Sequence, residues 1–210
     1  MTHTLVLKNQ HFVLHPSGAA FWEEQHMLLV ADVHFGKITH FRKYGSAVPL
    51  EVAHKNFEKL NKLIADFNPG RICFLGDLFH SYINSEWDMF ARWTQEISSK
   101  IILITGNHDI ISPLRYQKIN VQLYDEWIID HFLLTHHPEE KPKLFNFCGH
   151  IHPAIRLQGK GRQSLKLACF FEGERQLIFP AFGVFTGTHL MEIGKKNKAY
   201  VITENEVFPV

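Results

Sequence analysis

Short apolar runs alternate with amphipathic stretches through the first half of the chain. Met27 to Val30, Arg71 to Leu75 and Ile101 to Ile104 are dense in large or β-branched apolar residues, which is typical of buried strands. Apolar residues at helical spacing between these runs predict helices from Pro49 to Phe67 and from Ser85 to Ser98. This alternation indicates parallel strands joined by crossover helices.

The second half of the chain is rich in short strand patterns. Strands are expected over residues 121–124, 127–129, 131–135, 145–148, 154–158, 164–170, 176–179, 189–193 and 199–202, and over 4–7, 12–14 and 19–22 near the start. Two β-rich halves with helices outside predict an α/β fold, a four-layer α/β/β/α sandwich with two mixed sheets. Because no linker, repeat or low-complexity segment interrupts the chain, we expect a single domain over residues 1–210.

Composition and charge limit the classes of function. With 45% apolar residues, 20% charged residues and a net charge of +1, this is an ordinary globular sequence, and a polyanion would have to bind a local patch. The three cysteines form no C-x-x-C pair, which favours a reducing compartment. The sequence shows neither a signal peptide nor an apolar run near the ~20 residues that span a bilayer. We therefore expect a cytoplasmic protein without membrane contact.

Histidine is the enriched residue, with 15 in the chain, and many of these lie in loops that follow predicted strands. Five strand ends carry side chains able to bind a metal: Asp32-x-His34, Gly76-Asp77, Gly106-Asn107-His108-Asp109, His136 and His150-x-His152. The carboxyl ends of parallel strands meet at one edge of a sheet, and residues i and i+2 of a strand point the same way. We therefore expect these side chains to converge on one site.

The predicted site is a mixed set of nitrogen and oxygen ligands without thiolates. Apart from His108 and Asp109, it holds two carboxylates, one amide and four imidazoles, which suits Mn, Fe, Zn or Co. Seven ligands exceed the need of one catalytic ion, but they suit two divalent ions that share a carboxylate. Such a pair can activate a bridging water and neutralise phosphoryl oxygens during an in-line displacement. We expect manganese, with Fe, Zn, Co or Ni as alternatives.

The ordered series D-x-H, G-D, G-N-H-D, H and G-H-x-H resembles the calcineurin-like metallophosphoesterase superfamily. The resemblance implies an α/β/β/α sandwich with a dinuclear centre that hydrolyses phosphoesters. By position, it implies that one metal is bound by Asp32, His34 and His152, the other by Asn107, His136 and His150, and both by Asp77. His136 is preferred to His137 because the first histidine after this strand is usually the ligand in that superfamily.

The same resemblance implies roles for the two remaining residues of the G-N-H-D motif. His108 would be the acid that protonates the leaving group or steadies the phosphoryl oxygens, and Asp109 would orient it. A purely structural turn is the alternative for this pair. Because all five motifs are present in order, we prefer the catalytic interpretation.

A narrower resemblance covers most of the chain. It rests on residues 32–37, 40–42, 45–49, 76–81, 135–138, 149–153, 156–162, 180–183 and 185–187. Together these segments are similar to the bacterial DNA-ligase-associated metallophosphoesterases, to which an endonuclease activity in the DNA-damage response is ascribed. The similarity implies a bacterial cytoplasmic enzyme that acts on DNA or a nucleotide and associates with DNA-ligase and helicase repair proteins, by family analogy.

Several polar residues outside the ligand set are candidates for substrate contacts. They are Lys37, His40, Arg42, His80, Arg156 and Arg162. Lys37, His40 and Arg42 suit either the non-reacting part of a phosphodiester or a solvated surface. Arg156 and Arg162 lie in a basic stretch that would suit a phosphate backbone, although a solvated hairpin is the preferred explanation. For His80, a polar neighbour of the site is favoured over a phosphate contact.

Two groups of apolar residues are assigned to the core instead of the site. Phe179, Phe182 and Phe185 indicate core packing rather than a platform for stacking bases. Cys73 and Cys148 lie inside apolar runs and predict inert buried thiols.

Three functions are compatible with these residues. The first is a phosphodiesterase or nuclease-like hydrolase that uses a metal-bridging hydroxide, and the second is a phosphomonoesterase for proteins or small molecules. The third is a metal-binding scaffold without activity. A monoester needs additional cation contacts, and a scaffold has no need to keep His108 and all seven ligands. The phosphodiesterase is therefore the preferred hypothesis.

Overall fold

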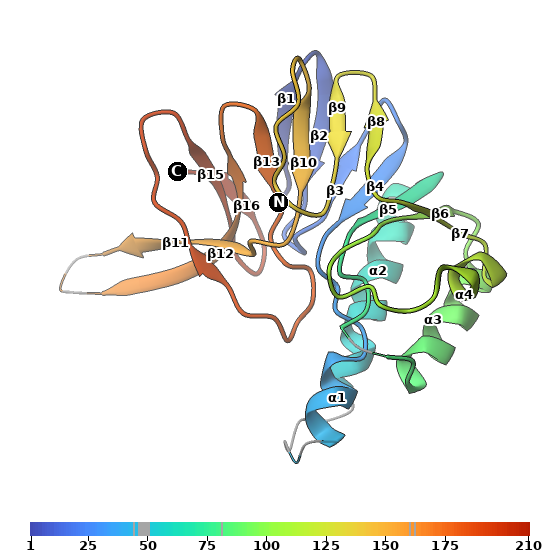
Figure 1. Ribbon diagram of the computed structural model, residues 1–210. Coiled ribbons are helices and arrows are strands. Elements are labelled where there is room, and N and C mark those ends of the chain that lie inside the picture. Colours follow the sequence, from blue (N-terminus) through green and yellow to red (C-terminus); the bar gives the residue numbers. More distant parts are fainter. Residues whose placement is uncertain (44, 46–50, 81, 160, 162) are drawn as a thin grey trace.

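Two β-sheets pack face to face, and helices cover the outer face of the first sheet (Figure 1). The structure, a computed structural model, describes residues 1–43, 45, 51–80, 82–159, 161 and 163–210. The first sheet has the order β1-β2-β3-β4-β5-β6-β7. Its strands are β1 (His3–Leu7), β2 (Gln10–Leu14), β3 (Ala20–Trp22), β4 (Met27–Val30), β5 (Arg71–Leu75), β6 (Lys100–Ile104) and β7 (Val121–Tyr124).

The two parts of the first sheet are built differently. Strands β1 to β4 form an antiparallel meander, whereas β4 to β7 are parallel, as the alternation of strands and helices predicts. The connections between the parallel strands contain the helices α1 (Lys37–Lys43), α2 (Glu51–Phe67), α3 (Ser85–Glu96) and α4 (Pro113–Lys118). The carboxyl ends of β4, β5 and β6 consequently lie at the same edge.

The second sheet is formed by the rest of the chain, and its main path has the order β14-β11-β12-β13-β10-β9-β8. In addition, β15 pairs with β12 and with β16. The strands are β8 (Trp127–Ile129), β9 (Phe132–Leu134), β10 (Phe145–Cys148), β11 (Pro153–Gln158), β12 (Ser164–Glu172), β13 (Gln176–Ile178), β14 (His189–Leu190), β15 (Lys198–Ile202) and β16 (Val207–Pro209). Because β9, β10 and β13 are parallel, their carboxyl ends also share one edge.

Alternating side chains of the parallel strands supply two hydrophobic cores. On β5, Ile72 and Phe74 pack with the helices, whereas Cys73 and Leu75 pack between the two sheets. A third cluster, which includes Cys148, lies on the other side of the second sheet. All three cysteines are buried and free, as expected of inert core thiols.

The sequence prediction differs from the structure in some elements. The short helices α1 and α4 were not expected, because seven and six residues are too few to show helical periodicity. Helix α3 ends at Glu96, two residues before the predicted end at Ser98, and its buried residues include Trp87, Phe90 and Trp93. The proposed helix start at Pro49 lies outside the described residues. Among the described residues, every helix is too short or too polar to span a bilayer.

Candidate metal centre

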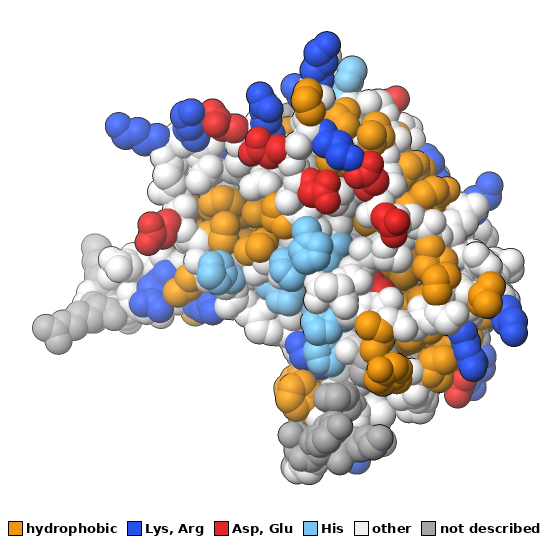
Figure 2. Space-filling view, viewed as in Figure 1, with side chains coloured by type: hydrophobic (Ala, Val, Ile, Leu, Met, Phe, Trp, Pro, Cys, Tyr) orange, Lys and Arg blue, Asp and Glu red, His pale blue; other side chains and the backbone are white. Residues whose placement is uncertain are grey.

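The carboxyl ends of five strands meet where the two sheets come together. The residues that follow these strands are Asp32 and His34 (β4), Asp77 (β5), Asn107 (β6), His136 (β9), and His150 and His152 (β10). Contacts of 2.9 to 4.0 Å connect all seven. Figure 2 shows histidines gathered near the centre of this face, with hydrophobic side chains beside them. The structure thus brings together every ligand position that the sequence predicts.

The backbone adopts an unfavourable conformation at most of these positions. Asp32, His34, Asp77, His150 and His152 have φ angles between 49° and 66°, in the left-handed region that residues other than glycine rarely adopt. Each such residue costs about 1–3 kcal/mol and persists only where its surroundings hold it. Backbone bonds supply that support here, since His34 N donates to Asp77 O at 2.9 Å. These left-handed conformations orient the side chains toward the site, whereas an ordinary extended backbone would orient them differently.

One set of side chains, the His34 group, consists of Asp32, His34 and His152. Asp32 Oδ1 lies 3.2 Å from His152 Nε2 and 4.0 Å from His34 Nε2. These three atoms are buried and have no hydrogen-bond partner among the described residues. Burial lowers the pKa of His34 to about 3, so its ring is neutral at pH 7. Neutral imidazoles and a free carboxylate oxygen fit a divalent cation.

A second set, the His136 group, consists of Asn107, His136 and His150. His136 Nδ1 lies 3.0 Å from Leu75 O, while its Nε2 lies 3.1 Å from Asn107 Oδ1 and 3.2 Å from His150 Nδ1. Burial alone would lower the pKa of His136, but the hydrogen bond and charge of Asp77 outweigh it and raise this pKa. The Leu75 carbonyl fixes the ring so that Nε2 faces the site, as in many metal-binding histidines.

Asp77 lies between the two groups. Its Oδ2 is 3.9 Å from His34 Nε2, and its Oδ1 is 3.4 Å from His136 Nε2. Burial would raise the pKa of Asp77, but the hydrogen bond and charge of His136 hold it at about 2. The carboxylate is therefore ionised at neutral pH and presents one oxygen to each group, which is the arrangement a shared ligand requires.

Residues 26–193 match the family model of the calcineurin-like phosphoesterases. The chain belongs to the calcineurin-like phosphoesterase family. The superfamily resemblance carried by the five motifs is therefore confirmed, and so is the enzyme class, a hydrolase of phosphoester bonds.

Solved structures with similar folds include one that matches over its whole length. The crystal structure of Pseudomonas putida nuclease MPE is 26% identical, with a TM-score of 0.83 and 100% of both chains covered. The Escherichia coli phosphoesterase Yfce is 14% identical with a TM-score of 0.44, covering 88% of this chain and 97% of its own. A search of curated protein sequences found no significant match. The match to nuclease MPE confirms the predicted fold, a mixed α/β protein with two mixed sheets.

Two glycines of the family motifs allow the strand-end loops to approach one another closely. A Cβ atom on Gly106 would lie 2.3 Å from Asp77 Oδ1, and one on Gly149 would lie 2.4 Å from Asp32 Oδ2. Contacts below 3.0 Å are not tolerated, so a larger residue would push the carboxylate out of place. In both cases glycine is required because a carboxylate that is distant in the sequence occupies the space that a side chain would need.

His108 and Asp109 lie beside the two groups. The His108 ring centroid is 5.6 Å from that of His34 and 4.8 Å from that of His80, and its backbone N–H donates to Asp77 Oδ1 at 2.9 Å. The Asp109 carboxyl group accepts backbone hydrogen bonds from Phe79 at 3.1 Å and from Gly106 at 2.9 Å. Burial raises the pKa of Asp109 to about 7. These two bonds hold the turn that carries His108, and the role of Asp109 in orienting the His108 side chain stays a prediction.

The predicted substrate contacts are spread more widely. Lys37 is half-buried at the start of α1, and burial lowers its pKa, against the opposing charges of Asp77 and Asp32. Arg42 and Arg156 are exposed, on α1 and β11. The side chain of His40, and Arg162 as a whole, lie outside the described residues.

His137 joins His136 and His150 in a third cluster that could hold an ion. Its ring centroid is 4.1 Å from that of His150, but the residue is exposed. His136 is buried and fixed by the Leu75 carbonyl, which supports the preference for His136 as the ligand. This assignment stays a prediction.

Sequence reasoning missed two residues of α2 that fix the site from outside. Asn56 is buried; its Nδ2 donates to Val33 O at 3.2 Å, and its Oδ1 accepts from Val184 N at 3.2 Å. Lys59 Nζ donates to Phe182 O at 2.6 Å and lies 3.9 Å from the centroid of that ring. Burial lowers the pKa of Lys59 to about 8. The available signal was an asparagine on the apolar face of a predicted helix, next to Phe57.

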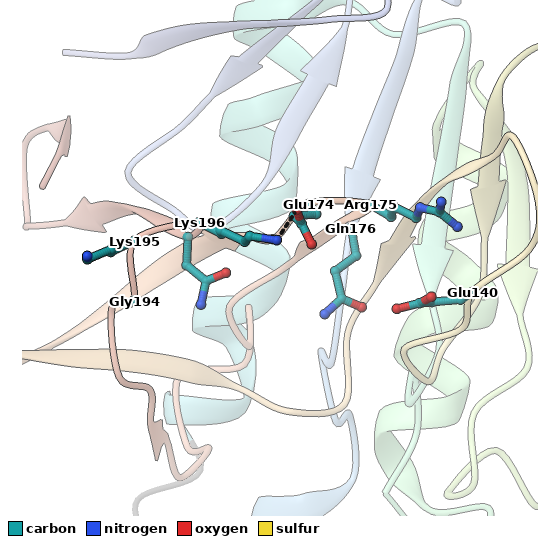
Figure 3. Close-up of a pocket in the computed structure, with 9 residues that line it drawn as sticks. Glu140, Glu174, Arg175, Gln176, Gly194, Lys195 and Lys196 are labelled. Atoms are coloured by element: carbon teal, nitrogen blue, oxygen red, sulfur yellow. Dashed lines mark ion pairs between the residues drawn. The ribbon is translucent and has the colours of Figure 1, made fainter.

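A cavity of about 770 Å³ lies away from the metal-binding residues, around the turn between β12 and β13 (Figure 3). Its charged side chains include Glu140, Arg175 and the ion pair of Lys196 with Glu174, whose Nζ and Oε1 atoms are 2.9 Å apart. Two carboxylates and three cations, Lys195 included, line the cavity, and none of the predicted site residues does. The cavity is therefore separate from the candidate metal centre.

Proposed function

We propose that this enzyme is a phosphodiesterase that acts on DNA or a nucleotide-like diester with two divalent ions, manganese being the expected metal. The observation that carries the proposal is the likeness to nuclease MPE over the full length of both chains. Family membership by itself supports hydrolysis of phosphoesters, and a nuclease is a hydrolase of phosphodiesters. The association with DNA-ligase and helicase repair proteins in a bacterial cytoplasm stays a prediction.

The two groups of side chains would each hold one ion, with Asp77 shared. Support comes from the two oxygens of Asp77, which face His34 Nε2 and His136 Nε2. When bound, such ions would lower the pKa of an attacking water and neutralise phosphoryl oxygens. The donor set is nitrogen and oxygen only, which suits manganese and other borderline divalent ions.

His108 would donate a proton to the leaving alkoxide. Its ring lies next to those of His34 and His80, and its backbone is tied to Asp77, so it would be held at a fixed place beside the scissile bond. Asp109 would keep the turn in place by accepting hydrogen bonds from Phe79 and Gly106. Proton donation of this kind typically contributes about 10²–10⁴-fold to the rate.

A leaving-group comparison tests this role. With Mn²⁺, the His108→Ala variant should lose about 10²–10⁴-fold in kcat on a dinucleotide, whose alkoxide needs a proton. It should lose far less on bis(p-nitrophenyl) phosphate, because p-nitrophenolate leaves without one. Metal content, measured by elemental analysis, should stay that of the wild type. His131→Ala, an exposed histidine before β9, is the matched control and should change neither rate.

Two outcomes would contradict the proposal. A full rate of His108→Ala on the dinucleotide would show that His108 is not the proton donor. A wild-type kcat/KM that is higher for p-nitrophenyl phosphate than for both diesters would make the enzyme a phosphomonoesterase.

A further inference from the structure

A second cavity adjoins the candidate metal centre. It has a volume of about 410 Å³ and lies between α1 and the segment 184–187. The residues that line it are Lys37, Phe41, Val184, Phe185, Thr186 and Gly187. We call it the Phe185 pocket. Its volume is in the lower part of the range of small-molecule binding sites.

The walls of the pocket carry aromatic rings in contact with solvent. Phe185 is 41% exposed and Phe41 is 37% exposed. Their ring centroids are 5.7 Å apart at an interplanar angle of 75°, an edge-to-face arrangement. The sequence had placed Phe185 in the core with Phe179 and Phe182, and the structure corrects this, because only the latter two are buried. An exposed aromatic pair beside a hydrolytic site is a surface on which a base can stack.

Hydrogen bonds attach one wall of the pocket to the loop that carries Asp32. Phe182 N donates to Ala31 O at 2.9 Å, and Gly183 N donates to Asp32 O at 3.1 Å. The next residue, Val184, donates to the Asn56 side chain, which also holds Val33. Phe185 therefore stands at a defined place relative to the His34 group.

The other wall is attached to the same loop through Lys37. Its backbone N–H donates to His34 O at 3.3 Å, so α1 begins directly after the ligand motif. Within the described residues, no carboxylate lies within 4.0 Å of the Lys37 ammonium, although its charge acts on Asp32 and Asp77. Lys37 thus lines the pocket together with the aromatic rings, and its half-buried ammonium group is within electrostatic reach of Asp77 and Asp32. A ring and a cation beside a metal-binding group suit a base and its phosphate.

We propose that the Phe185 pocket binds the nucleobase next to the scissile phosphate, with the base stacked on Phe185 and Lys37 contacting a non-reacting phosphoryl oxygen. This inference rests on the proposed phosphodiesterase function and adds a specificity site to it. A platform of this kind recognises the planar face of a base and so accepts all four bases. A base held there contributes equally to substrate binding and to the transition state, so its loss raises KM and leaves kcat unchanged.

Two substrates that differ only in the base test the pocket. One is the p-nitrophenyl ester of thymidine 5′-phosphate, and the other is the same ester of 1,2-dideoxyribose 5-phosphate, which has no base. Both release p-nitrophenol, so the chemistry is the same. For the wild type with Mn²⁺, kcat/KM should be about 10-fold higher for the thymidine ester, as expected for one stacked base.

Substitutions in the pocket should remove this preference without affecting the abasic substrate. Phe185→Ala should raise KM for the thymidine ester to that of the abasic ester, with kcat unchanged, and Phe185→Trp should restore the preference. Because Phe185 is partly exposed, its removal leaves the core intact. Val6→Ala is the matched control: Val6 is 56% exposed on β1, three strands away from β4, and its loss should change nothing.

The outcomes separate this inference from the function on which it rests. Equal kcat/KM for the two esters in the wild type, or an equal loss on both in Phe185→Ala, would overturn the base site and leave the phosphodiesterase intact. Hydrolysis of neither ester would refute the phosphodiesterase itself. Loss of the preference in Phe185→Ala with its recovery in Phe185→Trp would establish the site.

Discussion

The two halves of the metal centre differ in how their side chains are paired. In the His34 group, one carboxylate oxygen and two imidazole Nε2 atoms are buried without a hydrogen-bond partner among the described residues. In the His136 group, both ring nitrogens of His136 face polar partners: a backbone carbonyl on one side and Asn107 and His150 on the other. The same family motif thus contains one set of unpaired ligands and one set of ligands already paired with each other.

This difference predicts that the two positions bind metal unequally. A cation that enters the His34 group displaces no protein hydrogen bond, and it relieves the cost of leaving buried polar atoms unpaired. A cation that enters the His136 group must replace the contacts of His136 Nε2 with Asn107 and His150. At most one of these is a hydrogen bond donated by Nε2, which carries no more than one proton, so the cost is about 1 kcal/mol. We infer that the His34 group is the tighter position and that the His136 group is the one that exchanges its ion.

The supports of the two groups differ as well. The loop of the His34 group is held by side chains of α2, namely Asn56 on Val33 and Lys59 on Phe182. The ring of His136 is instead held by the Leu75 carbonyl at the end of a central strand. Side-chain supports can be removed by mutation one at a time, so the contribution of the two groups can be separated.

Removal of the Asp77 charge, which faces both groups, should have the largest effect on kcat. Asp77→Asn keeps the size of the side chain but removes the ionised oxygen from both positions. We expect a loss on the order of 10³-fold in kcat with Mn²⁺, as for the removal of a central electrostatic group. Metal content after gel filtration should fall at both positions.

Asp130→Asn is the control for Asp77→Asn, because Asp130 is exposed and accepts hydrogen bonds from the side chains of Gln10 and Gln25, away from the metal-binding residues. It should keep the wild-type rate. If Asp77→Asn retained two ions and a rate near that of the wild type, Asp77 could not be the shared ligand, and the two groups would be independent sites.

Stepwise titration with Mn²⁺ should separate the two positions by about 10-fold in Kd, the upper range of the effect of one broken hydrogen bond. In isothermal titration calorimetry, His136→Ala should keep the tighter event, whereas His34→Ala should lose it. Two indistinguishable binding events in the wild type would argue against a difference between the groups. Loss of the tighter event in His136→Ala would reverse their order.

Local sequence was sufficient to predict which side chains converge, because a parallel sheet brings its carboxyl ends to one edge wherever the strands begin. Each of these residues lies within four positions of the end of its strand, so recognising the strand located the residue, while its role as a metal ligand stays a prediction. The side chains of α2 that hold the Asp32 loop could not be predicted in this way. Asn56 binds Val33 and Val184, whose positions in sequence are unrelated to its own, and only the packing of α2 on the sheet brings them together.

The misassignment of Phe185 has a similar cause. Three phenylalanines at a spacing of three suggest one buried face, but β13 ends at Ile178 and the chain beyond it follows neither helical nor strand geometry. Loop hydrogen bonds to Ala31 and Asp32 decide which ring is buried there. Periodicity is informative inside regular elements, and it loses its meaning where the backbone is shaped by distant partners.

The smallest expected effect is on metal affinity, when a side chain that supports the Asp32 loop is removed. Asn56→Ala removes the link between Val33 and the segment that follows Phe182, and we expect about a 10-fold weaker binding of the first Mn²⁺ equivalent, the lower end of the effect of residues behind a ligand. The second binding event should keep its affinity, since the described contacts of the His136 group involve no residue of α2. Calorimetric titration of the two events measures both quantities in one experiment.

Asn61→Ala distinguishes a specific support from a general loss of stability. Asn61 lies on the same helix, and its Oδ1 accepts a hydrogen bond of 2.7 Å from Trp93 Nε1, so its removal leaves a buried donor unpaired at about 1–3 kcal/mol. Both variants should therefore unfold at lower urea concentration than the wild type, but only Asn56→Ala should weaken the first metal. If Asn61→Ala weakened the binding of the first Mn²⁺ equally, the affinity for this ion would depend on the stability of α2 and not on the position of the Asp32 loop. If Asn56→Ala weakened both binding events, the two groups would share their supports. They would then differ only in the hydrogen bonds that their side chains make.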